Sequence, residues 1–115
     1  MTLVELTREE LEIAVEMYMA AAQLKVNKHF ERYDYLQPPT LILNTRGSKY
    51  WKVIKRDASG NDSVFSFIRI EDGALLKPAT WRAPYVKGNN YVRGYVNDES
   101  HGMNGTTAFG TAYSQ

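Results

Sequence analysis

Basic and aromatic side chains alternate closely in one part of the chain, residues 77–95. The segment holds four basic and four aromatic residues within nineteen positions. Cations bind phosphates, and flat rings stack on bases or on guanidinium groups. We therefore expect a binding surface for nucleic acid or a nucleotide here, formed by Lys77, Trp81, Arg82, Tyr85, Lys87, Tyr91 and Arg93.

The charge distribution agrees with this expectation. Residues 46–93 contain ten basic and four acidic side chains, a net charge of +6, although the whole chain carries only +1. Such asymmetry is typical of proteins with a polyanion site. A solvated sheet face rich in lysine gives the same count. In that alternative, Trp81 and the tyrosines cover the open face of the sheet while Lys77, Arg82 and Arg93 point to solvent.

No group of residues has the pattern of a catalytic or metal site. The chain lacks cysteine, which excludes disulfides, thiolate nucleophiles and cysteine-ligated metals. Neither His29 nor His101 has a second ligand at a typical metal spacing, and the segment Asp98–His101 holds a carboxylate, a hydroxyl and a base only as sequence neighbours. The glycine pattern of a P-loop is missing. We expect a binding protein and no enzyme, with no cofactor and no metal.

Length and composition indicate a single domain over residues 1–115. The chain is 43% hydrophobic and 23% charged, as in ordinary globular proteins. No apolar stretch approaches the roughly 18 residues of a membrane span, and Met1–Glu5 has no pattern of a secretory signal. Because cysteine is absent, a reducing compartment fits best. We expect a cytoplasmic protein without a membrane contact.

The first third of the chain predicts one long helix, at about 7–32. Thr7 and Glu10 fit a capping box, in which each side chain bonds the other's amide. Apolar residues then recur at helical spacing in two rows, and Pro38 stops any continuation. The second row is Ile13, Met17, Ala20 and Leu24. The alanines at 20–22 allow close approach of another element, so a homo-oligomer through this helix is one possible assembly.

Residues 40–78 predict an antiparallel meander. Short runs rich in β-branched and aromatic residues are separated by turn residues, and Gly73 is free to take a positive φ in a hairpin. In the second strand, Trp51 and Val53 fall on one face and Lys52 and Arg56 on the other. In the third, alternation places Val64, Ile68 and Ile70 on one face and Phe65 and Phe67 on the other.

Residues 79–115 have weak periodicity and contain five of the eight glycines from position 80 on. We interpret them as a loop-rich segment folded over an edge or a face of the sheet. The expected fold class is therefore α+β: one long N-terminal helix packed on a small antiparallel β-sheet of three to five strands, with a Gly/aromatic-rich C-terminal segment.

The segment from Phe67 to Pro84, with Lys77, Ala79, Trp81, Arg82, Ala83 and Pro84, is followed by Arg93-Gly94 and by Phe109-Gly110-Thr111-Ala112-Tyr113. This pattern resembles a group of small uncharacterised proteins of tailed bacteriophages, over roughly residues 49–113. The resemblance implies phage origin and expression in the cytoplasm of a bacterial host. It does not extend to the N-terminal helix, and it implies no established activity.

Two functions follow as hypotheses. The first is a phage accessory protein that binds nucleic acid or a nucleotide through the basic and aromatic residues of segment 77–93. The second is an inhibitor or adaptor that binds a host protein, for instance a defence component, with the same residues as hot spots.

Overall fold

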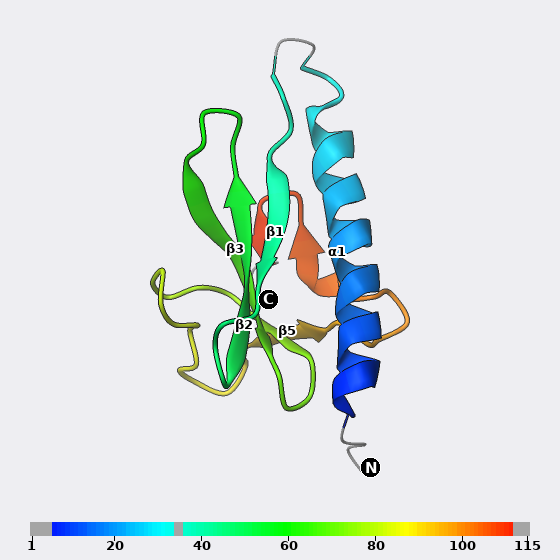
Figure 1. Cartoon of the computed structure of the whole chain (residues 1–115), viewed down its shortest axis with the longest axis vertical. Helices are drawn as coiled ribbons and strands as arrows, with labels where there is room; N and C mark the ends of the chain where they lie inside the picture. Colours follow the sequence, from blue (N-terminus) through cyan, green and yellow to red (C-terminus); the bar gives the residue numbers. More distant parts are fainter. Residues whose placement is uncertain (1–5, 34–35, 112–115) are drawn as a thin grey trace.

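The structure, a computed structural model, describes residues 6–33 and 36–111. It confirms the α+β prediction: a single long helix, α1 (Arg8–Phe30), packs against a five-stranded antiparallel sheet (Figure 1). The strands follow one another in the order of the sequence: β1 (Thr40–Asn44), β2 (Tyr50–Arg56), β3 (Asp62–Arg69), β4 (Ala74–Leu76) and β5 (Val92–Tyr95). Each strand pairs with its sequence neighbour, as expected for a meander.

Helix α1 begins with the predicted capping box. The amide of Glu10 donates to Thr7 Oγ1 at 3.1 Å, and the amide of Thr7 donates to Glu10 Oε1 at 2.9 Å. The helix ends at Phe30, close to the predicted boundary of 32. The helix residues that are buried against the sheet are Leu11, Val15, Tyr18, Ala22 and Val26. The helix side of the sheet is therefore the core side.

We call the sheet face toward α1 the inner face and the opposite one the outer face. The inner face carries Trp51, Val53, Ile68 and Leu75, all buried in one cluster with the helix. Among these apolar groups Ser66 shares a hydrogen bond of 2.8 Å with the hydroxyl of Tyr18, so both buried polar groups are paired. The opposite alternation places Tyr50, Lys52 and Phe67 on the outer face.

The predicted faces of β3 are wrong at its first half. Pairing of β2 with β3 shifts register between Val53 and Ile54, which leaves an extra residue in β3. Beyond this bulge Val64 lies opposite Ile54, and Phe65 joins the core cluster with Ile68. Phe65 and Phe67 therefore do not share a face, because the bulge changes the alternation between them.

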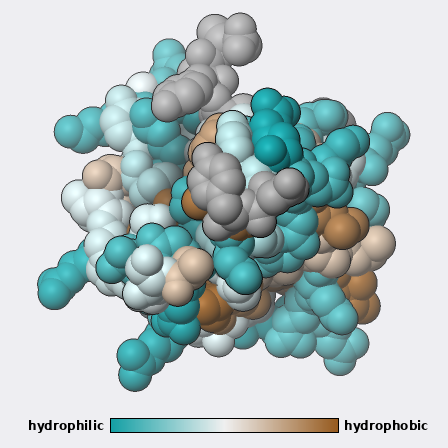
Figure 2. Space-filling view, turned by 90° about the horizontal axis from the view of Figure 1, so that it is seen from above, coloured by the Kyte–Doolittle hydropathy of each residue, from teal (hydrophilic) through white to brown (hydrophobic). Residues whose placement is uncertain are grey.

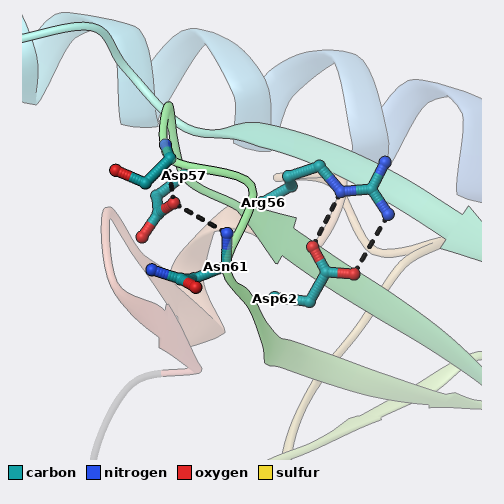
Figure 3. A network of polar contacts seen from close by, with 5 residues as sticks. Arg56, Asp57, Asn61 and Asp62 are labelled. Atoms are coloured by element: carbon teal, nitrogen blue, oxygen red, sulfur yellow. Dashed lines mark hydrogen bonds and ion pairs between the residues drawn. The ribbon is translucent and has the colours of Figure 1, made fainter.

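The turn between β2 and β3 is held by local polar contacts (Figure 3). Arg56 and Asp62 form a two-pronged ion pair at 2.8 and 3.0 Å. Asp57 Oδ1 accepts from the amide of Asn61 at 2.9 Å and from that of Ser59 at 2.9 Å. Side chains of the turn itself therefore stabilise this hairpin, and Asp62 neutralises the positive charge of Arg56.

The C-terminal segment contains more regular structure than predicted. Val92–Tyr95 forms β5 and completes the sheet, and a 3₁₀ turn, η1 (Met103–Gly105), leads to a small hairpin of β6 (Thr106–Thr107) and β7 (Gly110–Thr111). This hairpin contacts α1 through β6 and β3 through β7. Gly73 takes the predicted positive φ, 77°, at the β3–β4 turn. Ala112 and Tyr113 of the phage-like tail lie outside the described residues.

Within residues 6–33 and 36–111, no helix has both the length and the apolar composition required to cross a membrane.

Candidate functional site

The chain between β4 and β5 begins with a tight turn, residues 77–85. Pro78 and Pro84 form an isolated antiparallel bridge that closes its base. At the tip, Thr80 Oγ1 accepts from the amide of Arg82 at 3.2 Å. The turn thus holds Trp81 and Arg82 in a fixed position, with the Trp81 side chain 45% exposed.

Trp81 and Arg82 form one wall of a groove on the outer face of the sheet. The groove has a volume of about 370 Å³. Its floor comes from a row of residues that face one another across three strands, Asn44, Lys52 and Phe67. We call it the outer-face groove, lined by Asn44, Arg46, Gly47, Tyr50, Lys52, Phe67, Trp81 and Arg82.

Three cations converge on the outer-face groove, Arg46, Lys52 and Arg82, and the described residues that line it include no carboxylate. The Nζ of Lys52 lies 4.2 Å from the centre of the Trp81 ring. The pKa of Lys52 is lowered, first because partial burial desolvates its ammonium group and second because the charge of Arg82 repels it. A bound anion would relieve this repulsion.

Aromatic rings line the same groove. Tyr50 and Phe67 meet edge to face, with ring centres 6.3 Å apart. The Nζ of Lys49 lies 5.5 Å from the Tyr50 ring and adds a cation beside it. Trp81 offers the most accessible ring, since Phe67 is buried at the floor. The groove therefore combines positive charge with a surface on which a flat group can stack.

The structure brings together only two of the seven residues predicted from sequence, Trp81 and Arg82. The Nζ of Lys77 lies 4.8 Å from the Tyr85 ring, so these two side chains pair with each other. Lys77 lines a separate hollow beside the β6–β7 hairpin. Lys77 and Tyr85 thus lie outside the outer-face groove.

The remaining three predicted residues are also dispersed. Lys87 is exposed in the loop before β5, and Tyr91 is half-buried next to Arg69. The guanidinium of Arg93 donates from Nη1 to the carbonyl of Asn90 at 2.8 Å, and its Nε is buried without a hydrogen-bond partner among the described residues. Arg93 is not among the residues that line the outer-face groove.

Sequence reasoning missed six of the eight lining residues, among them the cations Arg46 and Lys52 and the aromatic residues Tyr50 and Phe67. The signal available was the alternation of β2, which puts Tyr50 and Lys52 on the face opposite Trp51 and Val53. What the sequence did not reveal is which face the turn at 77–85 covers. That contact joins residues about thirty positions apart.

Two other cations of the basic middle segment, Arg69 and Arg56, are neutralised by ion pairs. Arg69 and Asp72 pair at 2.7 Å, and the hydrogen bond that Arg69 donates to Asp72 raises the pKa of Arg69 above its ordinary value. Arg56 pairs with Asp62 at 2.8 Å. Arg46, Lys52 and Arg82, by contrast, line the outer-face groove, and the described lining residues offer them no acidic partner.

Comparison with protein families identifies the chain. Residues 2–108 match the model of a family of unknown function, DUF7717. The match spans nearly the whole chain, including α1, the five-stranded sheet and the outer-face groove, so the protein belongs to this family. Searches among curated proteins and among solved structures gave no match.

Proposed function

We propose that this DUF7717 protein binds single-stranded nucleic acid or a nucleotide in the outer-face groove. The sequence resemblance adds the setting, a small phage accessory protein in an infected bacterial cell. One observation carries the proposal: Arg46, Lys52 and Arg82 face a common groove whose walls are aromatic and whose described lining holds no acidic side chain. Such a groove favours a ligand that is both negatively charged and flat.

The two chemical features of the groove suit the two parts of a nucleotide. A phosphate placed among the three cations gains charge-assisted hydrogen bonds from the two guanidinium groups and offsets the repulsion between Lys52 and Arg82. A base can stack on the exposed ring of Trp81, which is worth about 1–3 kcal/mol per base. An unpaired strand fits better than a duplex, because stacking requires an accessible base face.

Binding of labelled oligonucleotides and cyclic nucleotides, followed by fluorescence anisotropy, tests the proposal. Affinity should fall steeply with salt, because bound cations release counterions from the phosphates. Intrinsic fluorescence gives a second signal, since Trp81 is 45% exposed and the only other tryptophan, Trp51, is 3% exposed. Failure to bind either ligand class at low salt would overturn the proposal.

Matched variants locate the site. Arg82→Ala and Lys52→Ala each remove a groove cation, so both should weaken binding strongly. Lys87→Ala removes an exposed cation of the same segment that lies outside the groove, so it should have little effect. Equal losses in all three variants would show that binding follows net charge and not the groove.

A second function has its own supporting observation. Trp81 is 45% exposed and its neighbour Arg82 is also exposed, so the tip of the turn offers an aromatic and a basic side chain of the kind that anchors protein partners. Here the protein is an inhibitor or adaptor of a host protein. Capture from nuclease-treated host lysate separates the two functions: a partner that is lost in Trp81→Ala supports the second function, and recovery of nucleic acid alone supports the first.

A further inference from the structure

The second apolar row of α1 is exposed. Ile13 is 61% exposed, Met17 47% and Leu24 69%, and Ala20 between them is also exposed. The four positions are spaced by four, three and four residues, which is the spacing of the contact seam in a helix pair. We call Ile13, Met17, Ala20 and Leu24 the helix seam. A soluble domain rarely exposes such a continuous apolar row without a partner.

The helix seam is separate from the outer-face groove. Helix α1 covers the inner face of the sheet, and the groove lies on the outer face. In the view along the long axis, hydrophilic residues cover most of the surface, and a hydrophobic area lies on the side where α1 runs (Figures 1 and 2). Nucleotide binding on the other side of the sheet leaves this area unexplained.

Charges along the exposed side of α1 differ between its two halves. The first half carries four acidic residues, Glu9, Glu10, Glu12 and Glu16, and one basic residue, Arg8, all exposed, so it is negative overall. The second half carries Lys25 and Lys28, also exposed, although Lys25 additionally donates to the carbonyls of Met103 and Thr106. This arrangement is complementary to a copy of itself that runs in the opposite direction.

We propose that the protein forms a homodimer through an antiparallel pair of α1 helices. In this register Ile13 lies against Leu24 of the second copy, and Met17 lies against Ala20. The acidic half of each helix then faces the basic half of the other, whereas a parallel pair would place like charges together. The helix dipoles also oppose each other in the antiparallel arrangement.

Geometry allows close contact along the pair. Helix α1 has 23 residues and is about 34 Å long, enough for the whole seam to meet its counterpart. Ala20 at the middle lets the two backbones approach. A single helix pair lies at the small end of stable interfaces, so a concentration-dependent equilibrium is expected. Because the grooves lie on the far side of each sheet, both stay accessible in the dimer.

Sedimentation velocity of the full chain over a range of concentrations measures the dimer. The wild type should shift from monomer to dimer as concentration rises, and Leu24→Glu should remain monomeric at concentrations where the wild type is dimeric. Val86→Glu is the matched control, because it places the same charge at a comparably exposed apolar residue outside α1. A wild type that stays monomeric throughout, or a dimer that tolerates Leu24→Glu, overturns the proposal.

The orientation is tested by crosslinking, for which the cysteine-free chain is suited. A mixture of Ile13→Cys and Leu24→Cys proteins, treated with a short bismaleimide, should give a mixed dimer. Ile13→Cys alone should give little product, because the two copies of position 13 lie about 16 Å apart along an antiparallel pair. Efficient crosslinking of Ile13→Cys alone would instead show a parallel pair. These readouts do not involve nucleotide binding, so they succeed or fail independently of the proposed function.

Discussion

The two faces of the sheet are built by the same strands and have opposite characters. In β2, Trp51 and Val53 point inward and are 3% and 0% exposed, whereas their neighbours Tyr50 and Lys52 point outward into the groove. The inner face excludes water and charge. The outer face gathers three cations beside accessible rings and leaves them without acidic partners in the lining.

The difference shows how a small domain combines a core with a binding surface. Because side chains alternate along a strand, every second residue supplies the core and the others are free to meet a ligand. Stability therefore depends on the inner residues, and binding depends on the outer ones. Substitutions on the two faces should therefore separate the two properties.

Truncation of the inner face should cost stability and leave the binding chemistry intact. Ile68 is fully buried in the core cluster, so Ile68→Ala should lower the free energy of unfolding by about 2–5 kcal/mol. Lys52→Ala, in the neighbouring strand and on the outer face, should change it by less than about 0.5 kcal/mol. Urea unfolding followed by circular dichroism measures both. Similar losses in the two variants would contradict the separation of the faces.

The inner face should also make the protein sensitive to alkali. Burial raises the pKa of Tyr18 to about 12, partly offset by its hydrogen bond to Ser66. An unfolded tyrosine ionises near pH 10, so the full contribution of the neutral Tyr18 side chain to the free energy of unfolding is present below pH 10. Between pH 10 and 12 the unfolded state releases its proton first, and stability should fall by roughly 2–3 kcal/mol.

Tyr18→Phe is the control for this pH dependence. The variant should be less stable at neutral pH, because the buried Ser66 hydroxyl loses its partner, at a cost of about 1–3 kcal/mol. Above pH 10, however, its stability should decline less steeply than that of the wild type. The free energy of unfolding, measured by chemical unfolding at several pH values, gives this decline. If it falls as steeply with pH in the variant as in the wild type, other groups cause the alkaline loss of stability.

On the outer face, loss of the exposed ring should affect binding and not folding. Trp81→Ala should weaken oligonucleotide binding by about 5- to 150-fold, the equivalent of one lost stacking contact. Trp81→Phe keeps a ring and should recover part of the affinity. Thermal unfolding should be nearly unchanged in both, because the side chain is 45% exposed. A large drop in melting temperature would instead place Trp81 in the structural framework.

The smallest effect is expected at the β2–β3 turn, at the end of both faces. Asp62→Asn removes the exposed ion pair with Arg56, and exposed pairs contribute little because solvent screens them (Figure 3). The hydrogen bond from Arg56 lowers the pKa of Asp62, so its contribution is present above the ordinary carboxyl pKa and fades as pH falls. Oligonucleotide binding should be unchanged. Tighter binding of the variant, measured by anisotropy, would instead indicate that the anion binds near Arg56, which loses its ion pair in this variant.

Local signals predicted the elements well. The capping box at Thr7 and Glu10 predicted the start of α1, and the hairpin glycine, Gly73, predicted the β3–β4 turn. The faces of β3 were mispredicted at Val64 and Phe65. A bulge depends on how two strands pair, and the sequence of neither strand alone indicates it. The pairing of Val92–Tyr95 with β4 was not predicted within the loop-rich segment for a similar reason, since it joins two strands that are separated along the chain.

For the candidate site, the sequence by itself determined the types of residue: cations interleaved with rings in one segment, and a basic middle between acidic ends. Tertiary structure decided which of them meet. Trp81 joins Lys52 and Arg46 because the turn at 77–85 folds over the outer face, whereas Lys77, Tyr85 and Arg93 are drawn to nearer partners. Composition and local spacing are properties of the chain alone, but contacts between distant segments depend on packing, which only the folded molecule defines.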